Sequence, residues 1–251
     1  MNILTSINLS TNEWILVIIS ALIIGLSKAG LSGLSMLVIP VLANVFGGKE
    51  STGILLPMLV IGDFFAVWYY NRHADWKSIK KLLPWTFVGL ILGTGVGNLI
   101  NDTQFKTLIG ILVIICLLLL LYTEKNRETL KFSNNMAIYI VSGIAAGFAT
   151  MIGNAAGPIF SVYLLASGFK KNSFIGTASW FFLIINLTKV PLQVFVWKNI
   201  TLSSAVTALV LLPAIALGVY IGTKIMKKIN EKIFRYLIIV MTAVAAFRLF
   251  I

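Results

Sequence analysis

The chain has 251 residues, of which 59% are hydrophobic and only 11% are charged. A soluble domain carries roughly 25% charged residues, so this composition excludes a soluble protein and indicates an integral membrane protein. The net charge of +12 does not indicate nucleic-acid binding, because the basic residues cluster in short loops between apolar segments, as in an inner or plasma membrane protein.

The apolar segments predict an all-α, polytopic membrane protein. Several separate segments exclude a single anchor, and the sequence lacks the alternating strands of about ten residues that form an outer-membrane barrel. The single cysteine, Cys116, lies in a Leu/Ile run, so neither an intrachain disulfide nor a metal cluster is expected. Residues 1–11 lack a basic region and a small-residue cleavage site, so no cleaved signal peptide is expected.

Trp14–Phe46 is the first predicted element, and it is too long for one crossing, which takes about 20 residues. Residues 25–33, GLSKAGLSG, interrupt it with three glycines, two serines and Lys28. Hydrocarbon tolerates a broken helix only where protein or a water-filled cavity satisfies the freed backbone groups. We therefore expect a re-entrant hairpin with a substrate site at its tip. The elements expected next are a helix over Gly53–Tyr70, a basic loop over Asn71–Lys81, and helices over Leu82–Ile100 and Phe105–Tyr122.

The second half repeats this order after a polar linker over residues 123–135. Met136–Ser167 is again apolar and is interrupted at residues 152–158, IGNAAGP. Pro158 fits the first turn of a new helix, where its missing N–H costs nothing. The remaining helices are expected over Phe174–Val196, Thr201–Ile225 and Ile233–Phe250.

An overlay of the two halves, with a shift of roughly 122–125 residues, indicates an internal duplication of the kind common in secondary transporters. We divide the single membrane domain into a first repeat over residues 1–122, a cytoplasmic linker over 123–135 and a second repeat over 136–251. The overlay places Gly25 on Gly147, Gly33 on Gly157, Gly53 on Gly176, Asp63 on Asn186, and Gly93 and Gly97 on Gly218 and Gly222.

The distribution of Lys and Arg favours hairpins over single crossings for the two interrupted elements. Single crossings would divide the basic loop residues nine and nine, whereas hairpins place fourteen on one side and four on the other. The positive-inside rule then puts the basic loops in the cytoplasm and both termini outside. Each half contains three crossing helices plus one hairpin, so the two repeats must have inverted topology, and both hairpin tips are expected near mid-membrane.

The interrupted segments predict a binding site for a small anion. Half-helices that begin near Gly33 and Pro158 would point positive dipole ends at one spot, and Lys28 adds a full charge. The alternative is that the glycines only allow close helix packing, while the Lys28 side chain extends to the membrane–water interface. The predicted substrate-binding residues are Lys28, Ser27, Gly30, Ser32, Gly33, Thr150, Asn154 and Gly157.

Polar residues in two crossing helices are candidates for the transport pathway or for proton coupling. Asp63 lies near the middle of its helix, and Asn186 occupies the matching place in the other half. Buried ionisable groups pair with each other or line a pathway, so Asp63 either forms a structural ion pair with Lys28 or Lys189 or acts on substrate or protons. The predicted pathway residues are Asp63, Asn186, Lys189 and Gln193.

The sequence does not indicate an enzyme. The only histidine, His73, lies in a loop, and there is no HExxH motif and no pairing of a nucleophile with a base. No catalytic residue, metal or cofactor is therefore predicted. The expected partners are the lipid bilayer and a small anionic substrate, with no nucleic acid. A channel with re-entrant pore loops is the alternative to a transporter.

Motifs that cover nearly the whole chain resemble those of the TauE/SafE sulfite exporter family. In the first half they are Gly25-Leu26-Ser27-Lys28-Ala29-Gly30, Thr52-Gly53-Ile54-Leu55-Leu56-Pro57, Gly62-Asp63 and Arg72-His73-Ala74-Asp75-Trp76. In the second half they are Gly147-Phe148-Ala149-Thr150-Met151, Gly153-Asn154-Ala155-Ala156-Gly157-Pro158, Gly176-Thr177 and Asn186-Leu187-Thr188-Lys189-Val190-Pro191.

This resemblance implies a permease of the bacterial cytoplasmic membrane that moves small sulfur-containing anions, such as sulfite or sulfonates, usually outward. The chain resembles the lysine-bearing variety of the family rather than members with a glycine-only first break. Lys28 would suit a carboxylate equally well. The predicted function is thus a secondary transporter that exports a small sulfur-containing or carboxylate anion by alternating access.

Overall fold

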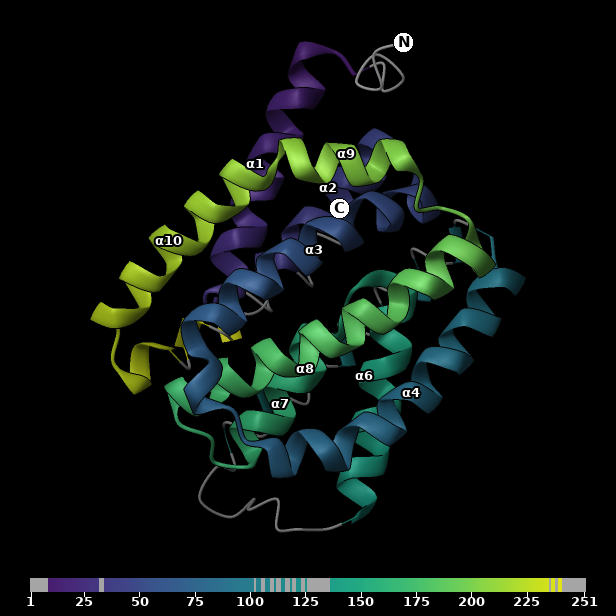
Figure 1. Cartoon of the computed structure of the whole chain (residues 1–251). Coiled ribbons are helices and arrows are strands. Elements are labelled where there is room, and N and C mark those ends of the chain that lie inside the picture. The colour runs from purple at the N-terminus through teal and green to yellow at the C-terminus, as the bar shows by residue number, and fades with distance from the viewer. Residues whose placement is uncertain are drawn as a thin grey trace.

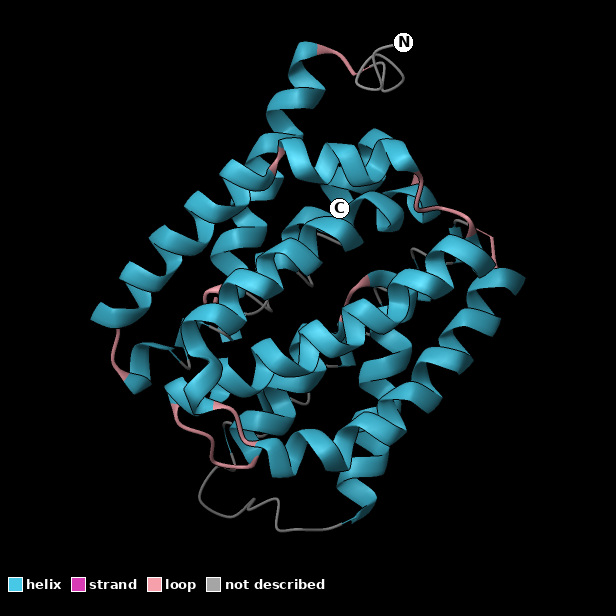
Figure 2. Cartoon of the chain, viewed as in Figure 1, coloured by secondary structure: helices cyan, strands magenta, loops and turns pink. Residues whose placement is uncertain are grey.

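The computed structural model describes residues 9–31, 34–101 and 136–234, together with individual residues between 103 and 125 and between 236 and 240. Within these residues the chain forms helices joined by short turns, with no strand (Figure 2). Ser32, Gly33, Cys116 and most of the expected helices over Phe105–Tyr122 and Ile233–Phe250 lie outside the described residues.

The described part of the first half contains the α-helices α1 to α4 (Figure 1). The interrupted element divides into α1 (Thr11–Lys28) and α2 (Leu34–Phe46), as expected. Ser10 begins α1 with a capping box, because its hydroxyl accepts the N–H of Glu13 while the Glu13 carboxylate accepts the N–H of Ser10. The third helix is α3 (Gly48–Tyr70), followed by the short 3₁₀ helix η2 (Asn71–His73) and by α4 (Trp76–Leu99).

The prediction of a basic loop over Asn71–Lys81 is wrong for the second part of that range, because α4 begins at Trp76. Asp75 accounts for the difference: one of its carboxylate oxygens accepts the N–H of Lys77 at 3.2 Å, and the other accepts the hydroxyl of Ser78 at 2.7 Å. This N-cap satisfies donors that the first turn leaves free, so the helix continues through the basic residues.

The second half contains α6 (Met136–Gly153), α7 (Ala156–Ala166) and α8 (Lys171–Pro191), which continues as a π-helix over Leu192–Trp197. The helix expected over Thr201–Ile225 is instead two helices, α9 (Leu202–Val210) and α10 (Leu212–Lys228), which meet at an angle of 49°. Pro213 lies in the first turn of α10, where its ring and missing N–H prevent an unbroken continuation from α9.

The chain is a multi-pass membrane protein. Five described helices are long and apolar enough to cross a bilayer, and the bent pair α9–α10 gives a sixth candidate. The five are α1, α3 with η2, α4, α6, and α8 with its π-helix. By contrast, α2 and α7 have 13 and 11 residues, which is too short for a crossing at about 20 residues.

The two halves pack against each other, since α1 lies against α10 and α4 lies against α6. At both contacts a glycine of one helix lies against the backbone of the other. A Cβ atom on Gly25 would lie 2.1 Å from the carbonyl oxygen of Ile215, and one on Gly147 would lie 2.0 Å from that of Thr86. Glycines that permit such approach are typical of membrane helix interfaces. The backbones could not come this close with any larger residue.

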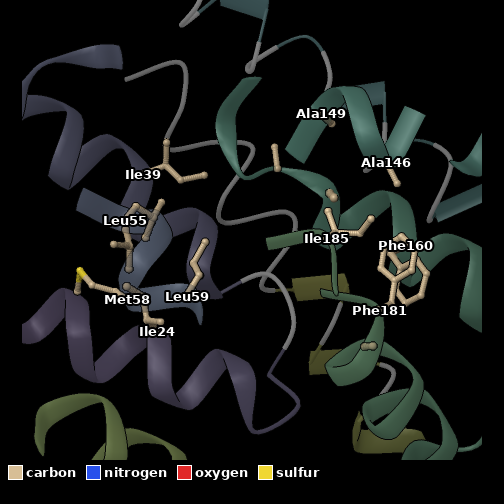
Figure 3. Close-up of a cluster of buried hydrophobic side chains, with 14 of the residues drawn as sticks. Ile24, Ile39, Leu55, Met58, Leu59, Ala146, Ala149, Phe160, Phe181 and Ile185 are labelled. Carbon is tan, nitrogen blue, oxygen red and sulfur yellow. The ribbon is translucent and has the colours of Figure 1, made fainter. Parts of the chain in front are cut away.

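The buried apolar side chains form one cluster to which helices of both halves contribute (Figure 3). One group comes from α1, α2 and α3, and it includes Ile24, Ile39, Leu55, Met58 and Leu59. The other group comes from α6, α7 and α8, and it includes Ala146, Ala149, Phe160, Phe181 and Ile185, with the rings of Phe160 and Phe181 stacked at 4.1 Å.

Candidate functional site

The end of α1 is fixed by a tight turn. The N–H of Ala29 donates to the carbonyl of Gly25, and the N–H of Gly30 donates to that of Ser27. Gly30 has a φ of 121°, a conformation that L side chains rarely adopt, and a Cβ there would lie 2.6 Å from Cδ1 of Ile175. The backbone conformation therefore requires glycine here, and the side chain of Ile175 on α8 packs closely against it. Lys28 is placed in the last helical turn, where a cation also complements the helix dipole.

The end of α6 has a corresponding turn built on Asn154. This residue has a φ of 53°, in the left-handed region that asparagine tolerates better than most residues, and its N–H donates to the carbonyl of Thr150 at 3.0 Å. Helix α7 then begins at Ala156 without any side-chain cap at Ala155. Its first N–H groups, at the positive end of the helix dipole, thus have no side-chain acceptor at the N-cap.

Lys28 and Asp63 form a buried ion pair between α1 and α3. Lys28 Nζ lies 2.6 Å from Asp63 Oδ1, and the side chains are 11% and 0% exposed, respectively. The other carboxylate oxygen, Oδ2, accepts a hydrogen bond of 2.7 Å from Asn186 Nδ2 on α8. Of the two lysines predicted as partners for Asp63, it is therefore Lys28 that contacts it.

Lys189 lies one turn beyond Asn186 and is fully buried. Its ammonium donates to Asn186 Oδ1 at 3.3 Å, to Thr150 Oγ1 at 3.2 Å and to Asn154 Oδ1. Together with the ion pair, these bonds make one continuous network from α1 through α3 and α8 to the break between α6 and α7. The network contains two lysines and one carboxylate.

A cavity lies at this network. The structure brings together around it eight of the residues singled out from the sequence, namely Ser27, Lys28, Gly30, Asp63, Thr150, Asn154, Gly157 and Asn186. Lys189 and Gln193 do not line it. Gln193 is fully buried in the π-helix, and its side-chain amide has no hydrogen-bond partner within the described residues. Ser32 and Gly33 lie outside the described part of the chain.

Six further lining residues were not singled out from the sequence: Ser35, Leu59, Ile175, Ala178, Ser179 and Phe182. Helical spacing could have found most of them. Residues three or four positions apart share a helix face, so a cavity at Asn186 also selects Phe182 and Ser179, and a cavity at Asp63 selects Leu59. The ring of Phe182 lies 5.2 Å from Lys28 Nζ and adds a cation–π contact.

These groups give the cavity a polar end and an apolar wall. At the polar end, the ammonium of Lys28 and the amide of Asn186 both contact the carboxylate of Asp63. Leu59, Ile175, Ala178 and Phe182 supply surface suited to carbon rather than to water.

Comparison with known proteins places this architecture in a family. None of the curated proteins and none of the solved structures matches the chain significantly. A family model, described as sulfite exporter TauE/SafE, matches residues 17–249, which include every element of the cavity. The chain therefore belongs to the TauE/SafE sulfite exporter family of membrane transport proteins.

Proposed function

We propose that the protein is a secondary transporter that moves a small anion, such as sulfite, a sulfonate or a small carboxylate, through the cavity by alternating access. The observation that carries this proposal is the buried network in which Lys28 pairs with the carboxylate of Asp63 at the cavity, beside the amides of Asn154 and Asn186 that contact Lys189. The ammonium of Lys28 and the side-chain amides of the lining are hydrogen-bond donors that suit a bound anion.

Lys28 is the group that would bind the anion directly. Its side chain lines the cavity, and its ammonium contacts both the carboxylate of Asp63 and the ring of Phe182. An anion at Lys28 would compete with Asp63 for the same donors. Binding would therefore weaken the contact between α1 and α3, and this competition supplies a physical link between substrate binding and helix movement.

Asp63 could couple this step to protons. Protonation removes the carboxylate charge and releases Lys28 for the anion, so binding of a proton and binding of the anion would favour each other. The anion and the proton would then move together. Asn186 is the other contact of Asp63 and would hold its side chain in place through the change.

The proposed topology has two inverted repeats, each with three crossing helices and one hairpin, α1–α2 or α6–α7. Two observations support it. In Figure 1, α1 begins at the top of the view, whereas α6 begins at the bottom. The residues that the overlay makes equivalent, Asp63 and Asn186, are hydrogen-bonded to each other, as expected of residues beside a two-fold axis. In this arrangement the basic loops are cytoplasmic and both termini are outside a bacterial inner membrane.

A ligand screen tests this function. Ligands that bind only the native state raise the thermal midpoint in proportion to ln(1 + [L]/Kd). We expect purified protein to be stabilised by at least one of sulfite, methanesulfonate, thiosulfate, sulfate and acetate, and Lys28→Met/Asp63→Asn to show no such shift. No shift with any of these anions would contradict the proposed site.

Flux in liposomes then separates the carrier from the channel. A carrier exchanges labelled outer anion for unlabelled inner anion, so uptake should rise when the vesicles are loaded with the stabilising anion. A pore would show no such stimulation and would conduct current at channel rates. Stimulated exchange supports alternating access, and conductance without it contradicts that mechanism.

A further inference from the structure

Lys189 differs from Lys28 in its relation to the cavity. It does not line the cavity and has no exposed surface. An ammonium has three N–H donors, and the structure provides three oxygen acceptors for them, on Thr150, Asn154 and Asn186. No donor of Lys189 remains for a substrate. Its role must therefore be exerted through the residues that it contacts.

The contact with Asn154 fixes the orientation of that amide. Lysine can only donate, so the Asn154 amide must turn Oδ1 towards Lys189 and Nδ2 away from it. Nδ2 is buried and has no hydrogen-bond partner within the described residues, while Asn154 itself lines the cavity. A buried donor without a partner is costly and awaits an acceptor.

The contact with Asn186 has a similar effect. Because Lys189 occupies Oδ1 of Asn186, the Nδ2 atom faces Asp63 and donates to its Oδ2. One oxygen of Asp63 is thus engaged by the amide, and the other is left for Lys28. Reversal of this amide would bring its oxygen against the carboxylate.

We propose that Lys189 is a positioning residue that orients the amides of Asn154 and Asn186, so that Asn154 Nδ2 faces the cavity as a donor for the bound anion. This inference rests on the proposed function of the cavity for its ligand. The orientation itself follows from the hydrogen bonds of Lys189 alone. In this scheme the anion is bound by Lys28, Asn154 Nδ2 and the start of α7, and Lys189 acts from behind Asn154.

A double-mutant cycle with sulfite as the probe tests the link between the two residues. The half-saturating concentration is taken from the thermal midpoint of the purified chain. Loss of a hydrogen bond to a charged group is expected to weaken binding by about 10-fold or more in Asn154→Ala and in Lys189→Met. If Lys189 acts through Asn154, adding Lys189→Met to Asn154→Ala should weaken sulfite binding by less than about 3-fold more, because the effects of coupled residues are not additive.

If Lys189→Met weakens sulfite binding equally in the wild-type and the Asn154→Ala chains, the proposal is overturned, because Lys189 would then act independently of Asn154. Lys198→Met removes an exposed lysine just after the π-helix that continues α8 and should leave sulfite binding unchanged. If Lys189→Met does not fold, Lys189→Gln is measured instead. Its amide keeps a donor for Asn154 Oδ1, so sulfite binding should weaken by less than about 3-fold, and a loss as large as in Asn154→Ala would overturn the proposal.

A stability comparison tests the orientation without any ligand. Asn154→Asp places a carboxylate oxygen against Lys189, so the thermal midpoint should stay level or rise with Lys189 present and fall by several degrees in the Lys189→Met background. The same shift in both backgrounds would show that Asn154 does not turn its oxygen to Lys189. If no anion binds the wild-type chain, the proposed function fails, and this comparison still decides the orientation.

Discussion

The ammonium of Lys28 lies 2.6 Å from Oδ1 of Asp63, and this ion pair joins the C-terminal end of α1 to the interior of α3. Both side chains are nearly or fully buried. Removing one partner of a buried ion pair leaves an uncompensated charge, whereas replacing both can be close to neutral. Single and double substitutions at this pair can therefore separate an effect on stability from an effect on transport.

Lys28→Met is expected to lower the free energy of unfolding by about 3–5 kcal/mol, because it leaves the Asp63 carboxylate buried without its cation. Lys28→Met/Asp63→Asn should recover most of this loss and still fail to transport, since the anion-binding ammonium is gone. Unfolding in detergent and flux in liposomes measure the two effects. Lys80→Met, at an exposed lysine of α4, is the control and should change neither. Normal transport by the double variant would contradict the assigned role of Lys28.

Asp63→Asn tests the coupling to protons. The amide keeps the size of the carboxylate but cannot take up a proton, so anion flux in liposomes should lose its dependence on an imposed pH gradient. Flux driven by the anion gradient alone should remain. An unchanged pH profile would leave Asp63 as the structural partner of Lys28 and nothing more.

The glycine contacts between the halves predict that alanine lowers stability where the facing backbone is close and not where the space is open. Gly25→Ala and Gly147→Ala place a Cβ about 2 Å from a backbone oxygen of the facing helix, and overpacking of this kind typically costs about 1–3 kcal/mol. Gly95→Ala is the matched control, because nothing lies within 4 Å of its added Cβ, and alanine should stabilise the helix by about 0.5–1 kcal/mol. Thermal midpoints of purified variants measure these effects. Equal midpoints for all three variants would contradict the close packing of α1 on α10 and of α6 on α4.

Much of the site could be predicted from the sequence, because the breaks in two apolar segments are visible as glycine, serine and asparagine clusters. A charged residue in such a break is costly in hydrocarbon, which marks Lys28 without any structure. The overlay of the halves paired Asp63 with Asn186, and the two are hydrogen-bonded.

The partner of each lysine could not be predicted. Which of Lys28 and Lys189 reaches Asp63 depends on the rotation of α8 about its axis and on the tilt of α1, and neither is encoded in local spacing. The apolar wall was missed although helical spacing marked part of it, since Phe182 lies one turn before Asn186 and Leu59 one turn before Asp63. The bend at Leu211 was also missed, although Pro213 was visible.

Topology is the remaining prediction, and cysteine labelling measures it directly. Cys116 is first replaced by serine, so that each variant carries a single introduced cysteine. Lys198→Cys should react with a membrane-impermeant maleimide in intact cells, because the hairpin topology places the end of α8 outside. Lys77→Cys, at the start of α4, should react only after permeabilisation. Both lysines are exposed, so lack of reaction reflects the side of the membrane and not burial. A reporter fused after Ile251 should likewise face the periplasm. Reaction of Lys77→Cys in intact cells, or a cytoplasmic reporter signal, would mean that at least one interrupted element crosses the membrane, and the two breaks would then no longer meet from opposite sides.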